Sequence, residues 1–186
     1  MKNDPIDYLK IGKAQQFYRS LGYKNIKTPW IVSTDAILVT IPPERRIQQA
    51  LDGALVASGE QGFIQMMMDG ELEPGIYQTA TPCFRDEPFY DETTLPWFIK
   101  LELISYMPAD WPTHQDRLLS DALNLFRKLT MDNCNTFDVV DTSEGKDIMC
   151  NGIELGSYGV RYWDNRHMWV YGTGIAEPRF SIATGA

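Results

Sequence analysis

Apolar residues recur at helical spacing in two long segments of the chain, residues 6–21 and 112–132. The first segment is followed by Gly22, a residue type that commonly ends helices. The second begins with Pro112, which fits the first turn of a helix. Its apolar positions then fall on one side: Leu118, Leu119, Ala122, Leu125, Phe126 and Leu129. Both segments are therefore predicted to be amphipathic helices.

The rest of the chain alternates between extended patterns and shorter helical ones. Strands are predicted where β-branched and aromatic residues gather between turn residues, at 26–32, 36–41, 75–84, 97–106, 137–141, 147–155, 160–163 and 167–171. Short helices are predicted at 45–55, 60–69 and 176–184. A strand pair, a helix and a run of strands in succession indicate an α+β fold with a largely antiparallel sheet, in one domain over residues 1–186.

Composition and charge exclude several classes of protein. Hydrophobic residues make up 44% and charged residues 23% of the 186 positions, which excludes wholesale disorder. No apolar run approaches the ~18 residues that span a bilayer, so no membrane segment is expected. Seventeen Lys and Arg against 25 Asp and Glu give a net charge of −8. Such a chain does not collect nucleic acid passively, because phosphate binding needs a basic surface.

Cysteine usage and the first residues bear on the compartment. The three cysteines, Cys83, Cys134 and Cys150, show no Cys-x-x-Cys spacing, and only His114 and His167 accompany them. This pattern argues against a zinc site and favours a reducing compartment. Residues 1–5 lack the apolar stretch of a secretory signal, so a cytoplasmic location is expected.

A charged pair follows the predicted strand 75–84. Arg85 and Glu87 are two residues apart, in the segment Pro82-Cys83-Phe84-Arg85-Asp86-Glu87-Pro88. On an extended chain both side chains face the same side. A guanidinium binds a phosphate or carboxylate through two parallel hydrogen bonds, and the carboxylate beside it can accept from an amino group. Taken alone, the pair is better explained as a cross-strand ion pair.

With the segment Leu95-Pro96-Trp97-Phe98-Ile99-Lys100-Leu101-Glu102, this stretch resembles motif 2 of the class II aminoacyl-tRNA synthetases. That motif is a strand ending in Phe-Arg-x-Glu, a loop, and a returning strand bearing Phe. The resemblance implies that Arg85 holds the α-phosphate of ATP and the carboxylate under activation. It also implies that Glu87 lies near the adenine amino group and that Phe98 stacks on the adenine ring. The expected fold is then a synthetase-like antiparallel sheet flanked by helices.

A second block runs from Asn151 to Arg161 and is similar to a segment of the subclass containing the aspartyl, asparaginyl and lysyl enzymes. The resemblance implies that Glu154 binds magnesium and ATP, that Ser157 belongs to the amino-acid site, and that Arg161 reads the end of the substrate side chain. Mg²⁺ prefers carboxylate oxygens and substrate phosphates. Alone, the block also fits a Gly-rich turn in an exposed hairpin, and Arg161 fits a surface residue paired with Asp164.

A third block, Gly172-Thr173-Gly174-Ile175-Ala176-Glu177-Pro178-Arg179-Phe180, resembles motif 3 of the family, Gly-x-Gly-x-Gly-x-x-Arg, with Ala176 in place of the third Gly. The resemblance implies a strand-to-helix turn under ATP that includes Gly174. It implies that Arg179 reaches the γ-phosphate and covers the adenine opposite Phe98, an arrangement in which a cation faces a π system. One such block is weak support, whereas three in the right order are specific.

Two fainter similarities precede motif 2. Residues 17–29 resemble motif 1, whose helix and strand build the dimer interface of the family, so a homodimer is expected. The segment Ala57-Ser58-Gly59-Glu60-Gln61 resembles the loop that binds the substrate's α-amino group, with Ser58 and Glu60 as the implied ligands. Ser58 equally fits the N-cap of the following helix, and residues 17–29 fit an ordinary amphipathic helix and strand.

The resemblance covers residues 13–184 and includes no anticodon-binding domain. We therefore expect a free-standing class II synthetase-like core that activates an amino acid, aspartate- or asparagine-like, with ATP and Mg²⁺. The acceptor of the acyl group is open; tRNA is supported neither by the charge nor by the domain content. The alternatives are an ATP-dependent amide-forming ligase, or a non-catalytic paralogue that binds a nucleotide or amino acid. The second alternative is disfavoured because the charged residues expected of the ATP site are all present: Arg85, Glu87, Glu154 and Arg179.

Overall fold

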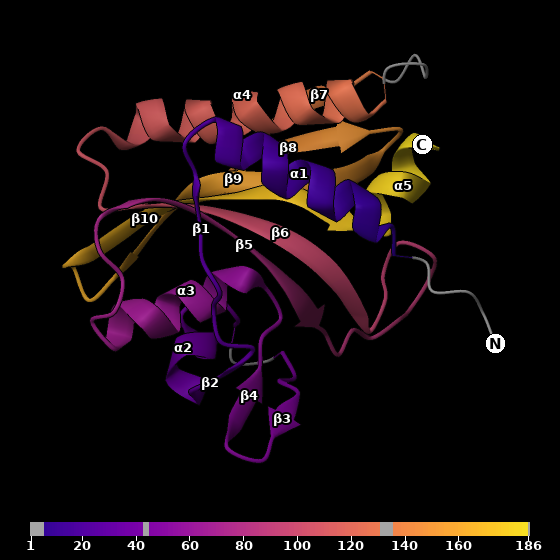
Figure 1. Cartoon of the computed structure of the whole chain (residues 1–186). Helices are drawn as coiled ribbons and strands as arrows, with labels where there is room; N and C mark the ends of the chain where they lie inside the picture. The colour runs from indigo at the N-terminus through magenta and orange to yellow at the C-terminus, as the bar shows by residue number, and fades with distance from the viewer. Residues whose placement is uncertain (1–5, 43–44, 131–135, 186) are drawn as a thin grey trace.

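A seven-stranded sheet organises the chain in the computed structural model, which describes residues 6–42, 45–130 and 136–185. The strand order is β1-β5-β6-β10-β9-β8-β7, and every neighbouring pair is antiparallel except β1 with β5 (Figure 1). The strands are β1 (Lys24–Asn25), β5 (Gly75–Phe84), β6 (Trp97–Tyr106), β7 (Asp138–Thr142), β8 (Gly145–Cys150), β9 (Ile153–Trp163) and β10 (His167–Glu177). The predicted α+β fold, a large antiparallel sheet flanked by helices, is confirmed.

One face of the sheet is covered by α1 (Tyr8–Ser20), α4 (Trp111–Leu129) and α5 (Arg179–Thr184) (Figure 1). Asp110 caps α4, accepting from the backbone N–H of Thr113 at 3.4 Å, and Pro112 occupies the first turn. The apolar side of α4 packs on β9 and β10, where it joins residues of α1 in one hydrophobic cluster. The two long predicted helices thus form, and α4 buries the face that its periodicity indicated. In α1 the buried residues are Ile11, Ala14 and Tyr18, whereas Leu9, which the pattern placed on the apolar face, is 67% exposed.

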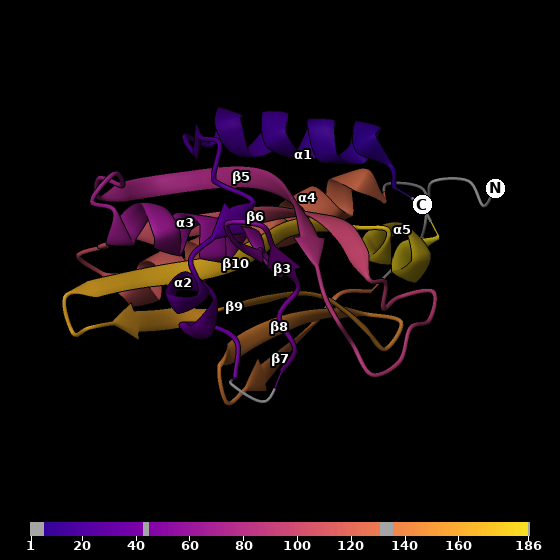
Figure 2. The same cartoon turned by 90° about the horizontal axis from the view of Figure 1, so that it is seen from below.

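The opposite face carries α3 (Gly59–Met68), α2 (Thr34–Leu38) and a small sheet of β2 (Ile31–Val32), β3 (Gln49–Ala50) and β4 (Gly53–Leu55) in the order β2-β4-β3 (Figure 2). A second hydrophobic cluster lies here, with Phe63 and Ile64 of α3 packed against Tyr77, Ile104 and Trp169 of the large sheet. The sheet therefore has a hydrophobic core on each of its two faces.

Two short elements differ from the prediction. Of the predicted strand 36–41, residues 36–38 belong to helix α2 and residues 39–41 form the turn after it. The hydroxyl of Ser33 caps this helix by accepting from the N–H of Ala36 at 3.2 Å. Residues 45–55, predicted as a helix, form the β3–β4 hairpin over the described residues. A side chain at Gly53 would meet the backbone oxygen of Val32 at 2.5 Å, so the tight approach of β4 to β2 depends on this glycine.

Boundaries also moved at the C-terminal strands. Asn151 and Gly152, both with positive φ, make a turn that ends β8, so the predicted strand 147–155 is divided and its second part joins 160–163 as β9. Strand β10 continues to Glu177, so the predicted helix 176–184 begins only at Arg179. Of the predicted strand 26–32 only β2 is extended in a ladder.

Some predictions fall on residues outside the described ranges: the start at 1–5, positions 131–132 of the long helix, and Cys134. The other two cysteines, Cys83 and Cys150, are buried and not disulfide-bonded. Among the helices of the described ranges, none has both the length and the apolar character needed to cross a membrane.

Candidate active site

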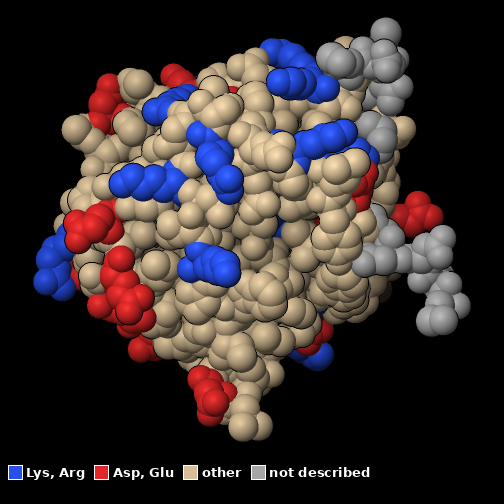
Figure 3. Space-filling model, in the orientation of Figure 1, with Lys and Arg blue, Asp and Glu red and all other residues tan. Residues whose placement is uncertain are grey.

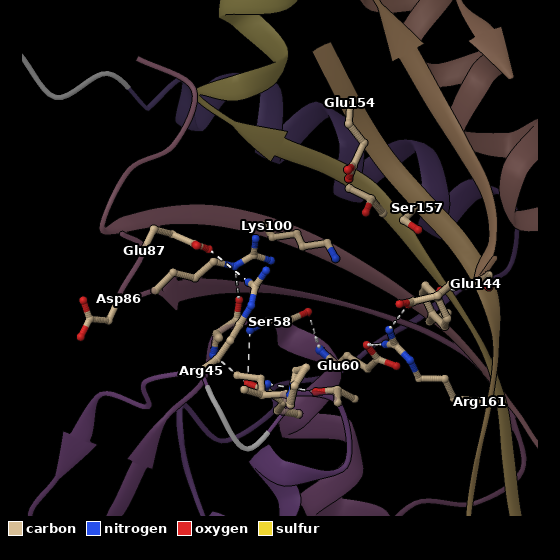
Figure 4. A pocket seen from close by; sticks show the side chains of 18 of the residues that line it. Arg45, Ser58, Glu60, Asp86, Glu87, Lys100, Glu144, Glu154, Ser157 and Arg161 are labelled. Carbon is tan, nitrogen blue, oxygen red and sulfur yellow. Dashed lines mark hydrogen bonds and ion pairs between the residues drawn. The ribbon is translucent and has the colours of Figure 1, made fainter. Parts of the chain in front are cut away.

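A cavity of about 340 Å³ opens on the face of the large sheet that α3 covers (Figure 4). Seven of the ten residues predicted for the site line it: Ser58, Glu60, Arg85, Glu87, Glu154, Ser157 and Arg161. Phe98 and Arg179 line a narrow slot that adjoins it, together with Arg85 and Glu87. The structure thus brings together side chains from segments as far apart as residues 58 and 179. Gly174 is the one predicted site residue that lines neither space.

Strand β6 presents charged side chains to the cavity because its residues alternate between the two faces of the sheet. Leu101 and Leu103 join the hydrophobic cluster under α1 and α4, so Lys100 and Glu102 face the other way. Lys100 Nζ lies 2.9 Å from Glu102 Oε2, and the Ser58 hydroxyl donates to the same oxygen at 2.5 Å. Glu102 is fully buried. These three side chains form a fixed polar group at the centre of the site.

Ser58 has the capping role that was one of its two interpretations. It is the N-cap of α3 and forms a capping box with Gln61, whose side chain accepts from the backbone of the cap. Its hydroxyl nevertheless reaches Glu102 and borders the cavity. The capping role therefore holds the start of α3, including Glu60, against the sheet.

Arg85 lies where β5 ends and makes two contacts. Its Nε donates to the carbonyl of Ala57 at 3.2 Å, and its guanidinium lies over the ring of Phe98, 4.9 Å from the ring centroid. The slot beside them measures only about 20 Å³. The guanidinium of Arg85 thus already covers one face of the Phe98 ring. Glu87 is held by an ion pair with Arg45 at 3.4 Å.

A β-bulge in β9 decides which side chains of this strand face the cavity. Ile148 pairs with Gly156 and Met149 with Glu154, which leaves Leu155 as the extra residue. Residues three apart on a regular strand face opposite sides, yet Glu154 and Ser157 both line the cavity. The bulge accounts for this arrangement, and Arg161 then follows on the same face.

A second bulge lies in β10 at Gly174. Thr173 pairs with Glu102 and Ile175 with Leu101, so Gly174 is the extra residue. Its carbonyl accepts from the Tyr18 hydroxyl at 2.9 Å, and a side chain here would come within 2.9 Å of the Tyr18 ring. Gly174 therefore faces helix α1 and lines neither the cavity nor the slot. The motif 3 glycines lie inside β10, which continues to Glu177. The expected strand-to-helix turn therefore falls at Pro178, four residues after Gly174.

Arg179 begins α5 and points back toward the loop between β5 and β6. Its Nε donates to the carbonyl of Thr93 at 3.3 Å, and one terminal nitrogen lies 4.0 Å from Glu154 Oε1. Burial lowers the pKa of the Arg179 guanidinium from its usual value. Arg179, Glu154 and Arg85 thus surround the boundary between slot and cavity, which suits a chain of phosphates.

Arg161 and Glu60 pair with each other. Arg161 Nη1 donates to Glu60 Oε2 at 2.5 Å, while Glu60 Oε1 accepts from the indole N–H of Trp169 at 2.7 Å. The second arm of Arg161 reaches Glu144 at 3.0 Å. Burial, the largest single influence, lowers the pKa of Arg161, but the charge and hydrogen bond of Glu60, with smaller contributions from Tyr171 and Glu144, together raise it. Asp164, the alternative partner, binds Arg166 instead at 2.8 Å.

Sequence reasoning missed Lys100, Glu102 and Glu144. The first two had a visible signal, because two charged residues at alternate positions of an otherwise apolar strand place both charges on one buried face. Glu144 lies on the turn between β7 and β8 and is 70% exposed at its side chain, so nothing in its local sequence separates it from a solvated turn.

No group of three or more His, Cys, Asp or Glu side chains suited to a metal ion occurs among the described residues. Glu154 fits magnesium in another way. Mg²⁺ is commonly bound through one or two carboxylates plus substrate phosphates. Glu154 is half exposed and lies beside Arg179, whose guanidinium is suited to binding phosphate. His114 and His167 are hydrogen-bonded to Ser105 and Tyr106.

Comparison with known proteins gives the fold an identity. No family model and no curated protein matches the sequence. The structure, in contrast, matches pyrrolysyl-tRNA synthetase from Desulfitobacterium hafniense with a TM-score of 0.72 and 19% identity, over 100% of this chain and 72% of that one. Seryl-tRNA synthetase from Pyrococcus horikoshii, solved with ATP, matches with a TM-score of 0.75 and 18% identity over 94% of this chain and 49% of its own. This chain has the class II synthetase catalytic fold.

A third match supports the same conclusion about the fold. The cytoplasmic serine-tRNA ligase from Naegleria fowleri, solved with AMP, has a TM-score of 0.73 at 16% identity, over 94% of this chain and 47% of its own. Identities this low establish the fold and not the substrate. The neighbours named here are pyrrolysyl and seryl enzymes, so the similarity of residues 151–161 to the aspartyl, asparaginyl and lysyl subclass stays a prediction.

Proposed function

We propose that this protein activates an amino acid with ATP, forming an aminoacyl-adenylate and releasing pyrophosphate. The observation that carries the proposal is that two sets of side chains line one cavity of a class II fold, one suited to phosphates and one suited to an amino acid. Cationic groups suited to phosphates, Arg85 and Arg179, lie at one end, and the buried Glu60 with Arg161 lies at the other. A nucleotide and an amino acid bound there would meet near Arg85.

In this reaction the substrate's carboxylate attacks the α-phosphorus, the bond to the bridging oxygen breaks, and pyrophosphate leaves. The chain's contribution is positioning and charge stabilisation, because the attacking group is already ionised. Arg85 would leave Phe98 to hold the carboxylate and the α-phosphate together, while Phe98 receives the adenine. Arg179 would orient the leaving pyrophosphate. Mg²⁺, bound by Glu154 and the phosphates, would supply charge neutralisation.

The amino-acid end would recognise the substrate's ammonium group. Glu60 is the carboxylate best placed for this role, because it is buried and its orientation is fixed by Trp169. Ser58, through Glu102 and Lys100, keeps the start of α3 in place, and Ser157 borders the same space. Arg161 would face the substrate's side chain, in agreement with an aspartate- or asparagine-like substrate.

The acyl acceptor is open among tRNA, a small amine and another macromolecule. On the face seen in Figure 3, Lys and Arg side chains are spread across the upper half, where α1 and α4 run. These helices cover the face of the sheet opposite the cavity. The cavity itself is lined by five Lys or Arg and five Asp or Glu side chains, so its charge gives no preference for nucleic acid. We also propose a homodimer through residues 17–29, which include β1 at the edge of the sheet.

The test is amino-acid-dependent ATP–pyrophosphate exchange, run over all amino acids without tRNA. We expect exchange with one or two amino acids and a loss of at least about 10²-fold in the variant Arg85→Ala, because a charge-assisted contact in the transition state is removed. The matched control is Arg127→Ala, an exposed arginine on α4. Near-normal exchange by the folded Arg85→Ala variant would show that the motif 2 assignment is wrong.

A further inference from the structure

Both arms of the Arg161 guanidinium are engaged by carboxylates of the chain itself. One arm donates to Glu60 and the other to Glu144, at 3.0 Å, while the plane of the group lies over the Tyr171 ring, 4.2 Å from its centroid. Figure 4 shows the three charged side chains side by side at one end of the cavity. A substrate group that needs Arg161 must therefore compete with two carboxylates already bound to it.

Counting charges at this end gives an excess of one negative charge. Glu60 and Glu144 carry two negative charges, and Arg161 carries one positive charge. The ion pair of Lys100 with Glu102, at the centre of the site, adds no net charge. The ammonium group of an amino acid brings one positive charge and balances the set. Its carboxylate belongs with Arg85, at the other end. The charges at this end therefore sum to zero when the bound amino acid has a neutral side chain.

A second carboxylate, as in aspartate, would upset this balance. It would enter a region where the two cations, Arg161 and Lys100, each already contact at least one carboxylate of the chain. Like charges at 4–6 Å in a partly buried site repel, and the repulsion lowers affinity. A carboxamide has the same shape without the charge; its oxygen can accept from Arg161, and its NH₂ can donate to Glu144.

We propose that Glu144 is a specificity-determining residue, which neutralises Arg161 and makes the cavity select amino acids with a neutral polar side chain, asparagine-like, over aspartate. The inference rests on the proposed function for the assignment of this end of the cavity to the amino acid. It narrows the pair of aspartate- and asparagine-like substrates to its uncharged member.

The position of Glu144 makes this role testable. It lies on the turn between β7 and β8, and its side chain is 70% exposed, so Glu144→Gln removes the charge without opening the core. Asp116 provides a matched control: it is also 70% exposed at its side chain, makes one ion pair, with Lys146 at 3.3 Å, and does not line the cavity. Asp116→Asn changes the net charge by the same amount.

The experiment compares wild type, Glu144→Gln and Asp116→Asn in two assays, pyrophosphate exchange and calorimetric binding of free amino acids. We expect wild type to favour its best neutral amino acid over aspartate, and Glu144→Gln to narrow that ratio about tenfold while Asp116→Asn leaves it unchanged. A tenfold change is modest because the ion pair is largely exposed. A wild-type preference for aspartate, or equal ratios in all three proteins, overturns the proposal.

Failure of the proposed function gives a different result. If no amino acid supports exchange, the protein does not activate amino acids on its own, which leaves a binding module or an acceptor-dependent enzyme. The binding assay alone then decides the inference. Selective binding of a neutral amino acid, weakened in selectivity by Glu144→Gln, still supports it. Absence of binding by any amino acid overturns it. A wild-type preference for aspartate would instead favour the amide-forming ligase, which consumes that substrate.

Discussion

Replacing the carboxylate of Glu60 by an amide should weaken the fold, and removing the partner charge as well should restore much of the loss. Glu60 is 4% exposed and binds both Arg161 and the Trp169 indole. Glu60→Gln keeps an oxygen for Trp169 but leaves Arg161 with only Glu144, at 3.0 Å. A hydrogen bond to a charged group contributes about 1.5–3 kcal/mol, so we expect a loss of about 2 kcal/mol.

For a domain of this size, 2 kcal/mol corresponds to a fall of about 4–8 °C in Tm. Arg161→Met should cost a similar amount, because it leaves Glu60 buried without its counter-charge. In the double variant neither unpaired charge remains, and we expect a coupling energy of at least about 1 kcal/mol. Urea unfolding followed by tryptophan fluorescence measures the free energy of unfolding of the wild type, the two single variants and the double variant.

The exposed pair Asp164–Arg166, treated in the same way, serves as the control and should show a coupling near zero. Strict addition of the two losses in the Glu60 and Arg161 double variant would refute the reasoning, since independent sites add. It would mean that the contact contributes nothing beyond what each side chain gains from its other neighbours.

Three further predictions concern other parts of the molecule. Burial raises the pKa of Glu177 from 4.5 to about 7, so the free energy of unfolding of the wild type should fall by about 3 kcal/mol as the pH rises between these values. Glu177→Gln should remove this pH dependence in denaturant titrations. Gly59→Ala should lower stability by about 1–3 kcal/mol and weaken amino-acid binding in calorimetry, because its Cβ would lie 2.8 Å from Thr81 Oγ1. The control Gly12→Ala has free space around the new Cβ and should not destabilise the protein. Light scattering at tens of micromolar should give twice the 21.2 kDa chain mass; the monomer mass would contradict the homodimer.

Sequence reasoning succeeded where local pattern and tertiary packing agree. Strands β5 and β6 match their predicted ranges residue for residue, because each is a ten-residue extended pattern with clear ends. β5 lies between Pro74 and Arg85, and β6 between Pro96 and the turn at Met107-Pro108. The amphipathic pattern of α4 likewise has only one side that can be buried. Nine of the ten predicted site residues line the cavity or slot. Three of them, Arg85, Glu87 and Phe98, follow or lie on β5 and β6, whose ranges were predicted correctly.

The failures concern features that depend on neighbours distant in sequence. The bulges at Leu155 and Gly174 are set by register with the adjoining strands, which local sequence does not encode. Local sequence therefore does not show that Gly174 faces Tyr18 and lines neither the cavity nor the slot. The position of Arg85 over Phe98, and the capture of Arg161 by two carboxylates, are choices among partners that only the folded chain brings together.

The turn between β7 and β8 has a consequence for how this protein can diverge. Residues of the sheet and of the helices packed on it are constrained by packing, so most substitutions there lower stability. Glu144 contributes a charge to the same cavity from a solvent-exposed turn, where replacements are nearly neutral for folding. Ligand preference can therefore drift by single substitutions without a compensating change in the core. Among descendants of this sequence, variation at position 144 should accompany changes of substrate before any residue of β6 or α3 is altered.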